Sequence, residues 1–410
     1  MTVNRVVYNK YDRILVLLVL SLFLGGIGGA FQAPRILAVL FLPFLVGKVA
    51  NCKCIRNILL FFVLFILYSF VSLLWTPDVQ EGLKEIIYYF INFILLTEII
   101  VFSKYAKEPL KSLSHGWAVV VFLLSLIVAW ELATGNHLSM AREEDMSMNF
   151  GGVVADRLTV SATYGNYNGY VTFLCFAIPW IIYYFLNSES LFFRGISLIA
   201  LLGSFVAILI NGSRGGLFCL GIFAVVYFLF IPKNKKNVLR SLILVAILGV
   251  ILFKYSEELL LVITLKSEAT GMTTDKPRMD IWSASLNILL QTGGVGVGVG
   301  GMIPALKAYS SSIIPITHNI FLEALLQYGV IPSLFFFGFL IKLFKRGLKV
   351  LDKNRRMSVI MSLAALPVYG IINSNYLLGP DLYVLLGTIF VFVYYELIKA
   401  IHPILRGPSF

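Results

Sequence analysis

The chain has 410 residues, of which 59% are hydrophobic and only 13% are charged, and its formal net charge is +12. A water-soluble globular fold of this size is excluded, because so few polar groups could not cover its surface. The positive charge does not indicate nucleic-acid binding, because no basic soluble face and no nucleic-acid motif accompany it.

Long runs without charge recur along the chain, each long enough to cross a bilayer as a helix. The sequence therefore predicts an all-α polytopic membrane protein that forms a single integral membrane domain over residues 1–410. We predict about twelve transmembrane helices, at roughly 13–30, 34–50, 57–75, 83–103, 113–133, 165–186, 193–211, 215–231, 238–255, 317–341, 357–376 and 381–400. The first of them is not a cleaved signal peptide, because further spans follow it. The fourth fits the pattern least well, since it carries Lys84, Glu85, Asn92 and Glu98.

The positive charges predict the orientation. An even number of spans puts both termini on one side, and most of the 33 Lys and Arg residues lie on that side. The positive-inside rule then makes both termini cytoplasmic. Two long connections, about 134–164 and 256–316, lie on the outer side, and loops of this length usually carry function or are disordered. We therefore expect the chemistry outside, away from ATP and nucleotide sugars.

The first outer loop ends in "TYGNYNGY", where Tyr164, Asn166 and Asn168 open the sixth span. Polar side chains at the outer mouth of a helix bundle suit contacts to sugar hydroxyls. An aromatic belt with a polar helix cap is an equally good interpretation. Arg157, in the same loop, is a further candidate for substrate binding.

Arg214 lies in "NGSRGG", a very short outer turn between the seventh and eighth spans. An arginine with little water around it needs an anionic partner, and its guanidinium can bind phosphate oxygens in pairs. The alternative is an arginine that reaches from the helix end to the lipid headgroups.

The second outer loop contains "RMDIWSASLNILLQTGG", which begins at Arg278. The apolar residues in it, together with Trp282, predict a helix that lies in the outer membrane interface. In the alternative interpretation Arg278 is an ordinary surface residue. The run "GGVGVGVGG" at 293–301 is not a dinucleotide fingerprint, because no strand precedes it in a βαβ unit. We interpret it as a flexible or close-packed loop beside the site.

His318 opens the tenth span in "ITHNIFLEALLQYG". Thr317 is a plausible N-cap, which places His318 and Asn319 in the first helical turn. A helix N-terminus and a nearby arginine both favour the neutral imidazole, the form that a general base requires. The alternative is a histidine that anchors a helix end at the interface. Glu323, one turn later, is either a buried functional carboxylate or a hydrogen-bond partner of another helix. We expect no cofactor and no metal site, since no zinc spacing is present.

Three of these motifs together resemble the O-antigen ligase/O-antigen polymerase superfamily of bacterial envelope glycan enzymes. They are "NGSRGGLF", "PRMDIWSASLNILLQTGGVGVGVGG" and "THNIFLEALLQYGVIPSL", and their order and common outer side make the resemblance fairly specific. "TGNHLSM" and "TYGNYNGY" also resemble family features, less specifically. The resemblance implies a glycosyltransferase without a metal ion. It also implies a donor glycan on undecaprenyl diphosphate at the periplasmic face of the bacterial inner membrane.

The resemblance also implies roles for the candidate residues. His318 would take the proton from an acceptor hydroxyl, and Arg214 and Arg278 would stabilise the diphosphate leaving group. The remaining candidates would bind substrate: Asn319, Tyr164, Asn166, Asn168, Arg157 and Glu323.

Two activities share this architecture. A polymerase transfers the growing chain to a new lipid-linked repeat unit, and a ligase transfers the finished chain to lipid A–core. The spacing from Arg278 to Gly294 and the stretch "ELATGNHL" resemble polymerases. Besides these two lipid acceptors and membrane lipids, a chain-length regulator is a candidate partner. The alternative from another class is a carrier or a flippase for the same glycan lipid, because twelve spans with both termini inside match many transporters.

Overall fold

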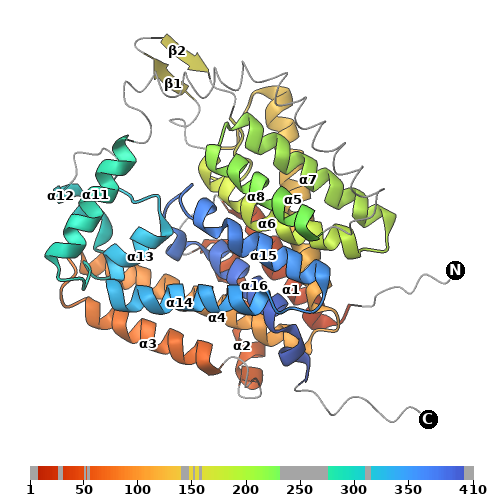
Figure 1. Ribbon diagram of the computed structural model, residues 1–410, viewed down its shortest axis with the longest axis horizontal. Coiled ribbons are helices and arrows are strands. Elements are labelled where there is room, and N and C mark those ends of the chain that lie inside the picture. Colours follow the sequence, from red (N-terminus) through yellow and green to blue (C-terminus); the bar gives the residue numbers. More distant parts are fainter. Residues whose placement is uncertain are drawn as a thin grey trace.

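The computed structural model describes residues 8–25, 31–49, 52, 56–139, 147–150, 153–156, 159–230, 276–309 and 315–400. The described residues are almost entirely helical (Figure 1). Before the second outer loop they form α1 (Lys10–Leu20), η1 (Ser21–Leu24), α2 (Ala33–Val49), α3 (Arg56–Ser72), α4 (Val79–Tyr105), α5 (Pro109–Thr134), α6 (Tyr167–Asn187), α7 (Leu191–Ile210) and α8 (Arg214–Phe230). After it they form α11 (Lys276–Gln291), α12 (Met302–Tyr309), α13 (Ile320–Tyr328), α14 (Val330–Gly347), α15 (Lys353–Tyr369), η5 (Tyr376–Leu378) and α16 (Pro380–Ala400).

The predicted class of fold, a helical polytopic membrane protein, is confirmed. Five of the described helices are long and apolar enough to cross a membrane, namely α4, α5, α6, α7 and α16. The helices α3 and α8 are apolar but shorter. The predicted ninth span, 238–255, lies outside the described residues, so the number of twelve spans stays a prediction.

One short hairpin departs from the all-α expectation. In the first outer loop β1 (Ser147–Phe150) pairs antiparallel with β2 (Val153–Asp156), with Ser147 opposite Asp156 and Phe150 opposite Val153.

The helices pack around α4, α5, α6 and α16. The helix α4 packs on α16 and α2, α5 packs on α1, α6 and α7, and α15 packs on α6 and α8. Trp117 of α5 is fully buried and donates its Nε1–H to Thr388 Oγ1 of α16 at 3.2 Å. A polar bond of this kind fixes the register of two helices whose surfaces are otherwise apolar.

The polar residues that made the fourth span irregular mostly have partners inside the protein. Asn92 Nδ2 donates to the carbonyl of Leu378 at 3.0 Å, and Lys84 is exposed and pairs with Glu81 at 2.9 Å. Glu85 is buried and accepts from Gly300 N at 3.0 Å. Glu98 is fully buried, and its carboxylate oxygens have no hydrogen-bond partner among the described residues.

The predicted tenth span is wrong as a continuous helix, because Gly329 divides it into α13 and α14. Gly329 has φ 78° and ψ −175°, and Val330 N donates to the carbonyl of Gly294 at 2.9 Å instead of continuing the helix. The glycine run of the second outer loop therefore packs against the break. Figure 1 shows α13 beside α11 and α12 at one end of the bundle, and α14 extending away from them.

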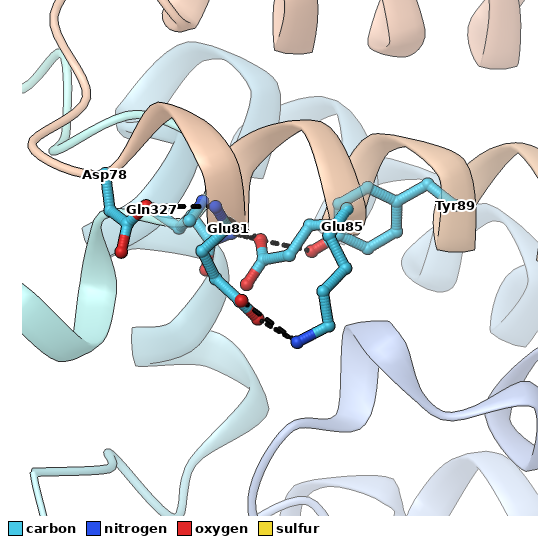
Figure 2. A network of polar contacts seen from close by, with 7 residues as sticks. Asp78, Glu81, Glu85, Tyr89 and Gln327 are labelled. Carbon is cyan, nitrogen blue, oxygen red and sulfur yellow. Dashed lines mark hydrogen bonds and ion pairs between the residues drawn. The ribbon is translucent and has the colours of Figure 1, made fainter. Parts of the chain in front are cut away.

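The glycine run 293–301 was predicted to be either flexible or close-packed, and the structure shows that it is close-packed. Gly294, Gly296, Gly298 and Gly300 all have positive φ. A Cβ atom at Gly298 would lie 2.7 Å from the carbonyl oxygen of Ser72, so only glycine fits there. Figure 2 shows Glu85 of α4 reaching Gln327 of α13 beside this loop, where Glu85 accepts a hydrogen bond from the Gln327 side-chain amide.

Replacing Gly329 by alanine should destabilise the protein by about 3 kcal/mol or more, because its φ is unfavourable for a side chain and a Cβ would lie 2.5 Å from Gly294 O. Gly338 of α14 is the matched control, since a Cβ there meets nothing within 4 Å. Gly338→Ala should instead raise stability by about 0.5 to 1 kcal/mol. Thermal unfolding of the purified proteins measures both changes, and equal behaviour of the two variants would contradict the proposed packing.

Candidate functional site

His318 lies directly before α13 rather than inside its first turn. The N-cap is Asn319, whose side chain accepts from Phe321 N at 2.9 Å and Leu322 N at 3.3 Å, so the prediction of Thr317 as N-cap is wrong. The reason is the backbone of His318, which has φ 47° and turns the chain just before the helix. Ile320 N also donates to the carbonyl of Gly370 at 2.8 Å, so contact with the residue that follows α15 helps to fix where the helix begins.

The imidazole of His318 is held neutral. Its Nδ1 atom is buried and has no hydrogen-bond partner among the described residues. Burial, and to a smaller extent the positive charge of Arg278, lowers the pKa of His318 from its ordinary value to about 4. At physiological pH the imidazole is therefore uncharged, which is the form that a general base requires.

Arg278 lies in the first turn of α11 and contacts the segment that follows α15. Its Nη1 donates to the carbonyl of Ile371 at 3.1 Å and its Nη2 to that of Ile372 at 3.4 Å. One helical turn later, Trp282 donates Nε1–H to the carbonyl of Thr317 at 2.8 Å. The face of α11 that carries Ile281 and Ile288 is buried against α13 and α12, so α11 holds both the histidine segment and the turn after α15.

Arg214 is the first residue of α8, and its side chain is exposed. The next residue, Gly215, packs on Ile372, where a Cβ would lie 2.7 Å from Cγ1 of Ile372. Since Arg278 bonds the carbonyl of that same isoleucine, the segments that carry Arg214, Arg278 and His318 all meet on residues 370–372.

The sequence did not single out this meeting point, a turn of residues 370–379 that we call the hub turn. The prediction placed most of it in the eleventh span, which in fact ends at Tyr369. Asn375 has φ 57°, and the 3-10 helix η5 follows. The available signal was the polar stretch Asn373, Ser374 and Asn375 between two apolar runs, together with Arg35.

Buried polar side chains hold the hub turn from both sides. The Glu323 carboxylate accepts from Tyr376 N at 3.1 Å and Leu377 N at 3.0 Å. On the other side Arg35 of α2, which is 3% exposed, donates from Nη2 to the carbonyl of Leu378 at 2.6 Å. Glu323 was predicted to be either a functional carboxylate or a hydrogen-bond partner of another helix. The observed bonds are structural ones, and they join Glu323 to a turn instead of a helix.

A polar cavity of about 220 Å³ lies beside the hub turn. Tyr164 and Asn166 line it, as do Asn373, Ser374 and Asp381. The side chain of Asn166 also caps α6 by accepting from Gly169 N at 2.6 Å. Asn168 is half-buried and does not line the cavity, and Arg157 lies outside the described residues.

The loop that leads into α6 is tied to the turn that carries Arg214. Asn211 accepts from Val160 N and donates to Val160 O, both at 2.9 Å, and its side chain is fully buried. This pair of bonds joins the connection before α6 to the connection before α8. Within the described part of the chain, no group of three His, Cys, Asp or Glu residues could hold a metal ion.

Comparison with known proteins supports the resemblance seen in the motifs. The family model of the O-antigen ligase matches residues 198–337, a range that includes Arg214, Arg278 and His318. The chain is also 26% identical over 292 residues to the teichuronic acid biosynthesis protein TuaE of Bacillus subtilis (strain 168), which is 67% of this chain. The match spans 57% of the length of that relative.

The fold defines a helical membrane protein. Within that class, the chain is similar to the O-antigen ligase family over residues 198–337 and to a teichuronic acid biosynthesis protein.

The position of Glu323 generates a prediction about stability. Glu323→Leu should lower the free energy of unfolding by about 2 to 5 kcal/mol, because two buried backbone N–H groups of the hub turn lose their acceptor. Glu323→Gln keeps one acceptor oxygen and should cost clearly less. Thermal denaturation of both variants in detergent measures the two losses of stability. Equal losses for Glu323→Leu and Glu323→Gln would contradict the prediction.

Proposed function

We propose that the chain transfers glycan at the outer leaflet of the bacterial inner membrane, from an undecaprenyl-diphosphate-linked donor to a sugar hydroxyl, as a surface-polysaccharide polymerase. The observation that carries the proposal is the meeting of the Arg214, Arg278 and His318 segments on residues 370–372. The match to the O-antigen ligase family favours glycosyl transfer over the carrier or flippase alternative.

The proposed orientation puts both termini in the cytoplasm and this end of the bundle in the periplasm. It is supported by the positive charges of the short connections and by the grouping of α11, α12 and α13 at one end (Figure 1).

In the proposed reaction the acceptor hydroxyl oxygen attacks the anomeric carbon of the donor sugar. His318 takes the hydroxyl proton, and the bond from the anomeric carbon to the diphosphate oxygen breaks, with its electron pair going to the diphosphate. The neutral state of His318 supports its role as the base. Two guanidinium groups, from Arg278 and Arg214, would bind the leaving diphosphate, which supports a reaction without a metal ion.

The cavity beside the hub turn is the proposed place for sugar. Its lining offers hydroxyl and amide groups from Tyr164, Asn166 and Asn373, which suit the hydroxyls of a glycan. In this proposal Asn319 and Glu323 act mainly by placing α13, because their side chains bond backbone N–H groups. The roles proposed for Asn168 and Arg157 are contacts to the glycan outside this cavity.

A ligase that transfers the finished glycan to lipid A–core is the second candidate. It is favoured by the description of the matched family, O-antigen ligase. The polymerase is favoured by the relative, whose name assigns it to the biosynthesis of a polysaccharide, teichuronic acid. A chain-length regulator is a proposed partner of the polymerase alone.

An assay with purified protein and lipid-linked repeat units tests the function. A ladder of longer glycans, formed in the presence of EDTA, is expected for a polymerase, whereas transfer only to lipid A–core would show a ligase. Protein that is folded but yields neither product would contradict glycosyl transfer.

The variants His318→Ala, Arg214→Ala and Arg278→Ala should each lower the transfer rate on the order of 10²-fold or more. Each removes either the proposed base or a cation that stabilises the leaving diphosphate. All three should remain inserted in the membrane. The matched control is Lys307→Ala, which removes an exposed cation of α12. Normal transfer by all three variants would refute the site.

The lowered pKa of His318 predicts the pH dependence. The neutral base is present above its pKa, so kcat/KM should fall as the pH drops through about 4. A bound diphosphate offsets the charge of Arg278 and favours the imidazolium, so the acidic limb of kcat should lie at higher pH than that of kcat/KM. Initial rates in liposomes between about pH 3 and 8 measure both limbs, and a reversed order would contradict the assignment.

A further inference from the structure

A second and larger cavity, of about 580 Å³, lies among α3, α4, α14 and α16, and nothing in the proposed reaction uses it. Its wall is mostly aromatic and aliphatic, with Phe62 and Phe93 on one side and Phe336 and Phe390 on the other. On α14 the lining residues run from Pro332 to Arg346, which is about 20 Å along a helix. This depth exceeds half of a hydrocarbon core of about 30 Å, so a lipid acyl chain fits lengthwise.

One end of this cavity carries a group of cations. Arg56, Lys342 and Arg346 line the cavity itself, and Lys345 and Lys349 continue the group around the end of α14. No Asp or Glu residue is among the described residues that line it. All three lining cations are exposed, and none of them makes an ion pair within the described part of the chain.

We propose that this cavity is a binding site for an anionic glycerophospholipid, with the phosphate at Arg56, Lys342 and Arg346 and the acyl chains between α3 and α14. The charge decides the occupant. An apolar cavity alone would suit any lipid, but three cations at its mouth favour a negatively charged headgroup. In the proposed orientation this mouth faces the cytoplasm, at the end of α14 remote from α13.

The far end of the cavity reaches Ala324 of α13 and Leu377 of the hub turn. A bound acyl chain therefore packs against the elements that place His318. Phospholipid binding at this cavity does not require glycosyl transfer, so a failure of either proposal leaves the other standing.

The test uses the purified full-length chain in a neutral detergent, titrated with phosphatidylglycerol or with phosphatidylcholine of the same acyl chains. Native mass spectrometry measures the bound fraction. Wild type should bind phosphatidylglycerol about a hundredfold more tightly than phosphatidylcholine. Each of the three cations near the headgroup contributes about a factor of five in affinity. The variant with Arg56→Gln, Lys342→Gln and Arg346→Gln should lose this preference. A control with Arg13→Gln, Lys107→Gln and Lys353→Gln removes three exposed cations elsewhere and should keep it.

A second pair of variants tests the apolar part. Gly338 lines the cavity and a Cβ there meets nothing within 4 Å, so Gly338→Phe should fill it and abolish binding of both lipids. Gly221 of α8 is equally open but does not line the cavity, and Gly221→Phe should bind as wild type does. Equal affinity of wild type for the two phospholipids would overturn the proposal. Displacement of phosphatidylglycerol by an equal amount of polyprenyl phosphate would overturn it too, because the cavity would then belong to an isoprenoid chain.

Discussion

The placement of the candidate site depends on two buried carboxylates that hold the short helix α13. Glu323 accepts backbone N–H groups of the hub turn, and Glu85 accepts the side chain of Gln327 and the backbone of Gly300. Burying a carboxylate is costly, and backbone donors offset this cost only when the geometry is fixed. The helix α13 has only nine residues and would not be stable in isolation. The two carboxylates hold it near both of its ends, and His318 lies directly before its first residue.

Much of the fold could be predicted from the sequence, because a chain in lipid must satisfy its backbone bonds internally, so uncharged runs become helices. The break at Gly329 could not be predicted. Glycine is common in membrane helices, and the partner that makes this one special, the carbonyl of Gly294, is distant in sequence. The polar residues of α4 are explained by their hydrogen-bond partners, which are distant in sequence. Asn92, for example, bonds the carbonyl of Leu378.

The candidate site was predictable in its three motif segments but not in what joins them. The motifs supplied Arg214, Arg278 and His318, and the resemblance predicted from them is supported by the family model that matches residues 198–337. The hub turn has no comparable pattern, because Asn373 and Ser374 look like any polar link between spans. The choice of Asn319 over Thr317 as N-cap likewise depends on a tertiary bond, from Ile320 N to Gly370 O, which no local propensity contains. The catalytic and binding roles themselves remain proposals.

The interruption at Gly329 has a mechanical consequence. Bilayers differ in thickness, and a spanning helix answers by changing its tilt. In a continuous tenth span such tilting would swing the histidine at its outer end. Here α14 can incline about the glycine joint while α13 stays fastened to its neighbours, so His318 is insulated from the elasticity of the surrounding membrane.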